Sequence, residues 1–391
     1  MRTPRLSDER GIALALAVFA LVVVGALVAG IFYTGQLEQR SGRNTLYASQ
    51  AQEAAEAGLA YEVGNWNSTV YNALPNGATL TDQVRMAVGP TGSQAATTFT
   101  TSVTRLNGTL FLIRSTGERF RAGGNVDQNV MGSRSVGMFA RLMTASFTAN
   151  AALTSRGNVR VGGNVTIDGN DNIPTGWGGC TTTAAKPGIR TSGTVTTNGQ
   201  PSISGDPDKQ TRDASVTDAS IRGPYDAIKG SANKIYTGNQ SLNGMAPVLT
   251  TPISPDTVHK CKTDVMSNWG EPIGGPGTYS VCQSYAPIIW VKGSLDVQTG
   301  RGQGILLVDG DLNVRGNFEF AGIVIVLGSL NSNGTGNKIS GTVMAANADI
   351  GDLTDLGGNP QVRFSSCAIN RVLQLSASAK PTARSFVQLY N

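Results

Sequence analysis

The chain has 391 residues, of which 15% are charged and 6% aromatic, and it carries 49 glycines and a net charge of +5. This composition, rich also in Thr, Ser, Asn and Val, favours β-structure with many turns over a large helical core. The 31 basic residues are scattered, so no specific nucleic-acid partner is expected. His259 is the single histidine, which excludes most hydrolytic triads and zinc sites. We therefore expect neither an enzyme nor a bound cofactor or metal.

Residues 12–33 form an uninterrupted run without charge. At about 1.5 Å per residue a helix of this length crosses a hydrocarbon layer of about 30 Å. Arg2, Arg5 and Arg10 precede the run, which predicts a cytoplasmic N-terminus and an exported body in a single-pass protein. Three interpretations compete: a cleaved secretory signal, whose apolar region is only about 7–15 residues, a generic signal anchor, and a prepilin-type leader.

The helix is predicted to continue beyond the membrane. Residues 36–63 contain no proline and many helix-forming residues. Small or apolar side chains recur there on one helical face, and small residues allow helices to approach closely. These positions are Tyr47, Ala51, Ala54, Ala55, Gly58 and Leu59. The sequence thus predicts one helix over residues 12–63.

Two short motifs give this segment a family resemblance. Arg10-Gly11-Ile12-Ala13-Leu14 and the stretch QAQEAAEAGL over residues 50–59 resemble the N-terminal module of PilX-like type IV minor pilins. The K-type minor pseudopilins of type II secretion are similar. The resemblance covers about residues 8–63. It implies a leader over residues 1–11, removed by prepilin peptidase between Gly11 and Ile12, and methylation of the new amine.

The resemblance also implies that the helix packs in a filament with other pilin or pseudopilin subunits and their assembly machinery. We assign Leu16, Ala51, Ala55, Glu56 and Gly58 to that packing. Most pilins carry Glu at the fifth mature residue, where it is thought to pair with a neighbouring terminal amine, whereas this chain has Leu16. Since Leu16 makes no such pair, the chain is expected to be a minor or tip subunit.

Residues 64–147 are predicted to form a small α+β head like that of pilins. Residues 64–95 are rich in Asn, Thr and Gly, which indicates loops with one short helix. Residues 98–115 indicate two strands around a two-residue turn at Asn107 and Gly108. Residues 133–143 supply a third strand.

Residues 148–391 are predicted to form a β-solenoid, with a β-sandwich as the alternative. Three similar heptads begin at Val291, Val308 and Val326, and their glycines are spaced at a near-constant period. Residues 339–345 and 161–167 have a similar shape. Residues at about 200–287 are rich in Pro, Asp, Ser and Gly, which indicates a long insertion on the flank.

The four cysteines, Cys180, Cys261, Cys282 and Cys367, contain no CxxC pair. An even number in an exported body fits two disulfides. We favour Cys261 with Cys282, which leaves Cys180 for Cys367.

Two functions remain open. The first is a non-enzymatic structural or priming subunit of a type IV pilus or pseudopilus, held in the cytoplasmic membrane with its body in the periplasm or at the cell surface. The second is an envelope-anchored β-helix that binds or processes polysaccharide. The second requires clustered carboxylates, and the acidic candidates resemble ordinary turn residues. They are Asp168, Asp171, Asp309, Asp311, Asp349, Asp352 and Asp355.

Overall fold

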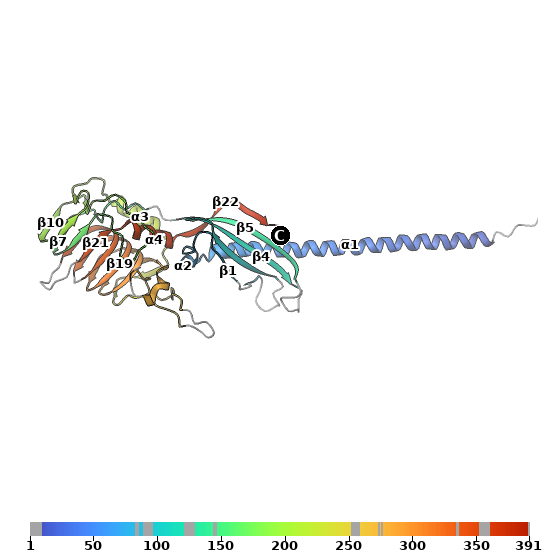
Figure 1. Cartoon of the computed structure of the whole chain (residues 1–391). Helices are drawn as coiled ribbons and strands as arrows, with labels where there is room; N and C mark the ends of the chain where they lie inside the picture. The colour runs from blue at the N-terminus through green and yellow to red at the C-terminus, as the bar shows by residue number, and fades with distance from the viewer. Residues whose placement is uncertain are drawn as a thin grey trace, which may run out of the picture.

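The computed structural model describes residues 10–82, 86–88, 97–120, 130–143, 147–251, 259–272, 274, 277–333, 336–351 and 360–389. A single long helix, α1 (Arg10–Gly64), projects from a β-rich body. The helix predicted over residues 12–63 is confirmed. Its proline-free sequence explains why it is continuous. Figure 1 shows its N-terminal half extending away from all other elements.

The C-terminal half of α1 lies on a six-stranded antiparallel sheet in the order β1-β3-β4-β5-β22, with β2 paired to β3. The strands are β1 (Thr79–Thr81), β2 (Met86–Ala87), β3 (Thr97–Arg105), β4 (Leu110–Phe120), β5 (Val130–Met143) and β22 (Ser378–Leu389). The predicted hairpin and third strand are confirmed. The short helix α2 (Ser68–Tyr71) precedes β1.

The hairpin turn is longer than the two residues predicted. The Leu106 amide donates to the Leu110 carbonyl, so three residues lie between these positions. Asn107 closes the turn with its side chain, whose Oδ1 accepts from the amides of Thr109 and Leu110 at 3.0 and 2.9 Å. Asn is therefore used here as a side-chain acceptor rather than for a left-handed backbone conformation.

The last strand corrects the predicted domain boundaries. The predicted C-terminal domain, residues 148–391, does not hold together as one unit, because β22 returns and pairs antiparallel with β5. Between these two strands lies the second unit, a sixteen-stranded sheet. Its described pairs are all parallel, unlike those of the antiparallel β-sandwich that was the alternative.

The parallel pairs fall into three ladders, each of which stacks equivalent segments. The first ladder runs through β13 (Lys234–Thr237), β15 (Ile288–Lys292), β17 (Gly300–Val308), β19 (Phe318–Asn333), β20 (Lys338–Gly351), β6 (Leu153–Ser155), β9 (Ile189–Thr191) and β12 (Lys209–Gln210). The second runs through β14 (Gln240–Leu242), β16 (Leu295–Val297), β18 (Leu312–Arg315), β19, β20, β7 (Val159–Gly163) and β10 (Val195–Gly199). The third runs through β17, β19, β20, β21 (Gln361–Phe364), β8 (Thr166–Asp168) and β11 (Ser202–Ser204).

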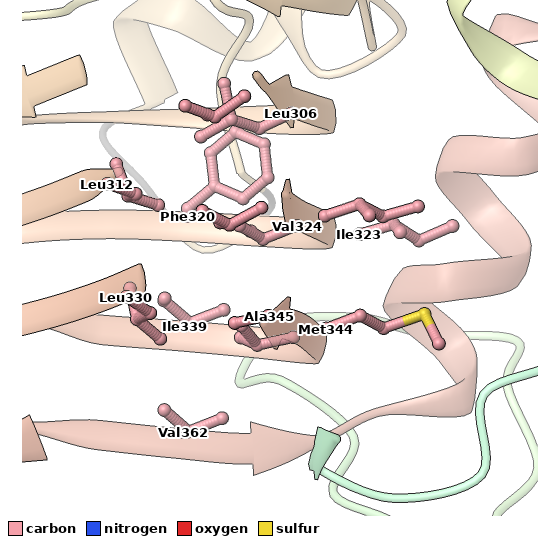
Figure 2. Packing of buried hydrophobic residues seen from close by; sticks show 14 of the residues in the cluster. Leu306, Leu312, Phe320, Ile323, Val324, Leu330, Ile339, Met344, Ala345 and Val362 are labelled. Carbon is pink, nitrogen blue, oxygen red and sulfur yellow. The ribbon is translucent and has the colours of Figure 1, made fainter. Parts of the chain in front are cut away.

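The sequence repeat matches this register. Val291, Val308 and Val326 pair in succession in the first ladder. Leu312 pairs with Leu330 in the second ladder, and Figure 2 shows both among the buried side chains between the strands. Branched apolar residues thus stack in columns and are removed from water together.

Two of the similar segments occupy other positions. Residues 339–345 run from the third ladder into the first, and residues 161–167 run from the second into the third. The three heptads instead run from the first into the second. Every bend between ladders needs small residues, so similar short motifs recur at different bends.

The predicted insertion is also smaller than expected. Four strands from residues 200–287 pair within the parallel sheet, namely β11, β12, β13 and β14. These strands are short and rich in Ser, Thr, Lys and Gln, so they show no hydrophobic pattern. Helix α3 (Asp218–Lys229) connects β12 to β13, and α4 (Ser366–Ser376) follows β21.

Candidate functional site

The N-terminal half of α1 is an exposed apolar cylinder. Its large apolar side chains from Leu14 to Tyr33 are between 39% and 72% exposed. Among the described residues, α1 is the one helix long and apolar enough to cross a membrane. An apolar surface on every side suits hydrocarbon rather than water.

The predicted processing site lies at the start of this helix. Gly11 and Ile12 belong to α1, and their side chains lie outside those that the structure describes. Leu16 follows on the helix and is 62% exposed.

The small-residue face of α1 has a different partner from the one predicted. Ala51 and Ala55 are fully buried, and Gly58 is buried with them. A Cβ added at Gly117 of β4 would overlap the carbonyl oxygen of Ala51, and one at Gly58 would lie 2.8 Å from the ring of Phe99. These residues therefore let α1 approach the chain's own sheet closely, and within this structure they are not offered to another subunit.

Glu56 remains on the exposed side of the helix, where its carboxylate accepts from the Gln52 side chain at 2.9 Å. Sequence reasoning missed the buried carboxylate one turn further on. Glu62 is 4% exposed and accepts from the Thr101 hydroxyl at 2.6 Å. Burial raises the pKa of the Tyr71 hydroxyl, and the hydrogen bond with Glu62 raises it further. This network fixes the end of α1 to β3 and α2.

A second contact links the segment after α2 to the end of α4, and so joins the antiparallel sheet to the parallel sheet. The Asn72 amide nitrogen lies 2.9, 3.2 and 2.8 Å from the carbonyl oxygens of Gln374, Leu375 and Ala377 at the end of α4. The Trp66 indole donates to the Asn72 side-chain oxygen at 2.8 Å. The C-terminal carbonyls of a helix need such partners.

His259 lies beside this junction. It lines a cavity of about 360 Å³ with residues of α2 and of the chain segment that carries Cys261. Its Nδ1 is 2.9 Å from the Thr250 carbonyl oxygen. A ring nitrogen facing a backbone carbonyl holds a loop in place.

The cysteines form two disulfides. Cys261 pairs with Cys282, and Cys180 pairs with Cys367, across 21 and 187 residues of sequence. The first closes the segment around residues 261–282, and the second ties the loop after β8 to α4.

The acidic candidates are engaged in local hydrogen bonds. Burial raises the pKa of Asp171, but the bonds from Ser366 and Thr183 outweigh this and leave it lowered. Asp168 is held similarly by Asn172, Ser204 and Asn170. A carboxylate surrounded by donors orders a turn and offers few lone pairs to a cation.

The remaining candidates follow the same pattern where they are described. Asp309 accepts from Tyr225 and Trp290, and Asp311 accepts from the Ser329 amide. Asp352 and Asp355 lie outside the described residues, as does the side chain of Asp349. No group of three or more His, Cys, Asp or Glu side chains suited to a metal occurs in the part of the chain that the structure describes.

A few solved structures match this chain. The crystal structure of the competence-associated pilin ComZ from Thermus thermophilus matches this structure over 88% of this chain and 96% of that chain, with 12% identity and a TM-score of 0.25. No protein-family model matches the chain, and no curated protein matches it.

Proposed function

We propose that the chain is a non-enzymatic structural or priming subunit, minor or at the tip, of a type IV pilus or pseudopilus. The observation that carries the proposal is α1 itself. One unbroken helix places an exposed apolar half next to a half that is seated on the chain's own antiparallel sheet. Such a helix can reside in a membrane and then move into the core of a helical filament, while the antiparallel sheet stays packed on its other half. The resemblance of residues 8–63 to PilX-like minor pilins supports the same role.

We further propose that the parallel sheet is a β-solenoid with three faces, one for each ladder. The supporting observation is that β17, β19 and β20 each continue from one ladder into the next. Glycines occupy one of the bends: Gly304, Gly322 and Gly341 pair in register with φ of 127°, 139° and 142°. A Cβ at Gly322 or Gly341 would overlap the carbonyl of the glycine before it in the stack, so only glycine fits these bends.

The proposal includes export and processing. Residues 1–11 act as a leader, prepilin peptidase cuts before Ile12, and the body stays outside the cytoplasmic membrane. Mass spectrometry of the N-terminal peptide from envelope-purified protein tests this step. We expect a methylated Ile12 terminus, and a Gly11→Leu variant that retains the leader. An intact leader in cells with active peptidase contradicts the processing.

Quantitative labelling tests the role in the filament. Gold-labelled antibody against the body should mark sheared filaments at their ends, and the chain should be scarce relative to the major subunit. Deleting the gene should reduce filament number and leave filament diameter unchanged. Uniform labelling at near-equal stoichiometry contradicts a minor or tip role.

A further inference from the structure

The two ends of the parallel sheet differ in whether another segment covers their last strands. At the end that begins with β13 and β14, residues 259–272 fold over the strands. The Lys234 ammonium donates to the carbonyls of Thr263 and Val265 at 3.0 and 2.6 Å, and the Tyr236 hydroxyl donates to that of Met266 at 2.7 Å. The disulfide from Cys261 to Cys282 anchors this covering segment.

At the opposite end the first ladder continues to β12, whereas the second and third ladders stop at β10 and β11. Strand β10 pairs with β7 and strand β11 pairs with β8, and neither has a second partner among the described residues. Figure 1 shows β10 at the extremity of the molecule opposite α1. The outer edge of these two strands, residues 195–199 and 202–204, is called the distal edge below.

Hydrogen-bond alternation identifies the free groups of the distal edge. The Val159 amide donates to the Thr194 carbonyl, and the Gln200 amide donates to the Gly163 carbonyl. Residues 194, 196, 198 and 200 therefore face β7, and Val195, Thr197 and Gly199 direct their amides and carbonyls outward. By the same alternation, with the Ser202 amide bonded to Val165, Ile203 faces outward in β11.

The apolar interior is also open at this end. Val195 and Ile203 are half-buried, whereas Val159 and Ile167, their partners one strand inward, are fully buried. A further segment stacked on the distal edge would cover both side chains. Its apolar residues would need to match the spacing of Val195 and Ile203.

Edge strands are normally protected against pairing by charges, proline or bulges. The edge strand β22 of the antiparallel sheet has such protection, with Lys380, Pro381 and a register shift after Pro381. The distal edge, residues 195–199 and 202–204, contains neither a charged residue nor a proline, and Pro201 lies in the bend between its two strands. The distal edge therefore lacks the usual protection against a pairing partner.

The molecule already joins separate segments in this way. Strands β20 and β21 stack in parallel on β6, β7 and β8, although Ala348 and its partner Val159 are far apart in sequence. Two stacks that are separate in sequence thus meet by strand pairing within the chain. The other end of the sheet is covered by residues 259–272, which argues against a second copy stacking end to end in the same direction.

We propose that the distal edge is a docking site that accepts an extended, uncharged segment of another protein as an additional parallel strand. That segment has the pattern of this chain's own strands, with apolar residues opposite Val195 and Ile203 and Thr, Ser, Asn or Gly elsewhere. Backbone hydrogen bonds supply most of the contact, and apolar contacts with the half-buried Val195 and Ile203 side chains set the register. The inference does not depend on the role in a filament.

The test uses the full chain in detergent micelles and the fluorescein-labelled peptide VTVGGNVTIN. This peptide has the sequence of residues 159–168, the segment that pairs with β10 and β11 in the fold, with Arg160→Thr and Asp168→Asn so that it is uncharged. Fluorescence anisotropy should show saturable binding, and a scrambled peptide should bind at least tenfold more weakly. Hydrogen exchange should slow at the amides of Val195, Thr197 and Gly199 when the peptide is bound.

Thr197→Pro is the decisive variant because it removes an outward amide and no amide that faces β7. It should weaken peptide binding at least tenfold with an unchanged unfolding temperature, and the matched Thr197→Val variant should bind normally. Equal binding of the scrambled peptide, no saturable binding, or unaffected binding by a folded Thr197→Pro variant would overturn the proposal. Dimers of the full chain that Thr197→Pro abolishes would overturn it too, since the occupant would then be a second copy. If Thr197→Pro does not fold, the hydrogen-exchange pattern of the unmodified chain decides.

Discussion

Gly117 is the residue at which the head sheet comes closest to α1. A side chain there would meet the helix backbone at Ala51 and Ala55, and backbone atoms have little room to move. The absence of a side chain, rather than backbone flexibility, is what this position requires, because its φ is not in the left-handed region. Close packing of this kind makes one added methyl group costly.

We therefore expect Gly117→Ala to lower the free energy of unfolding by about 1–3 kcal/mol, since either the helix or the strand must shift. Chemical denaturation monitored by circular dichroism measures the change. Gly108→Ala is the matched control in the neighbouring turn, where an added Cβ meets nothing within 4 Å. Equal stability of both variants would show that α1 is not seated as described.

Lys234 gives the covered end of the parallel sheet a dependence on pH. It is 2% exposed, and burial lowers the pKa of its ammonium from 10.5 to about 8, with Asp264 opposing the change. Below about pH 8 the folded and unfolded chains both carry the proton. As the pH rises from there towards 10.5, the unfolded chain binds more protons, so the free energy of unfolding rises with pH.

Between pH 7 and pH 9 we expect this rise to be on the order of 1 kcal/mol. Lys234→Met should remove it, whatever its effect on stability at pH 7. The exposed Lys292 of the adjacent strand provides the control variant Lys292→Met, which should keep the slope. Urea titrations at four pH values measure it, and an unchanged slope in Lys234→Met would assign the pH dependence to other groups.

Helix α4 is an element that joins the two parts of the body. It follows β21 of the parallel sheet and leads directly into β22 of the antiparallel sheet. Its last carbonyls are gathered by the Asn72 amide, which has two hydrogens to share among three oxygens. The buried Asn72 side chain therefore helps to hold the head against α4.

Asn72→Ala should lower the free energy of unfolding by about 1–3 kcal/mol, because it leaves buried carbonyls without a donor. Hydrogen exchange should quicken in the last turn of α4 and in the first residues of β22. Asn65→Ala removes one exposed bond to the Tyr61 carbonyl and should have little effect. Unchanged exchange at residues 374–377 in Asn72→Ala would contradict the role given to Asn72.

At the scale of the whole molecule, the apolar half of α1 and the distal edge lie at opposite extremities (Figure 1). Membrane insertion and pairing at the distal edge thus involve surfaces that do not compete. The proposed tip position rests on Leu16. A subunit with Leu at this position has no carboxylate there to pair with the terminal amine of a neighbouring subunit.

Leu16→Glu is expected to give no increase in the amount of chain recovered with sheared filaments. An unpaired carboxylate in hydrocarbon costs a few kcal/mol or is forced into its neutral form. Quantitative immunoblotting of the filament fraction measures recovery, with Leu16→Met as the control for changed packing. A clear increase for Leu16→Glu would mean that a neighbouring amine is present, and the tip position would be wrong.

The sequence by itself determined those features that depend on neighbouring residues. An uninterrupted apolar run forms a helix whatever it packs against, so α1 was predicted nearly to its ends. The two strands of the head hairpin and the register of the three heptads were likewise predictable from alternation and a repeated spacing, although the hairpin turn is longer than the two residues predicted.

Only the tertiary structure decided which distant segments lie together. The return of β22 to β5, the pairing of β20 with β6 and β7, and the burial of Ala51 against Gly117 all join residues far apart in sequence. The polar strands β10 to β14 show the same limit. Each is positioned by the strand on which it stacks, and none has a hydrophobic pattern of its own that would predict it. Parallel pairing leaves the order of the strands to non-local packing, and no local property of a strand encodes its neighbour.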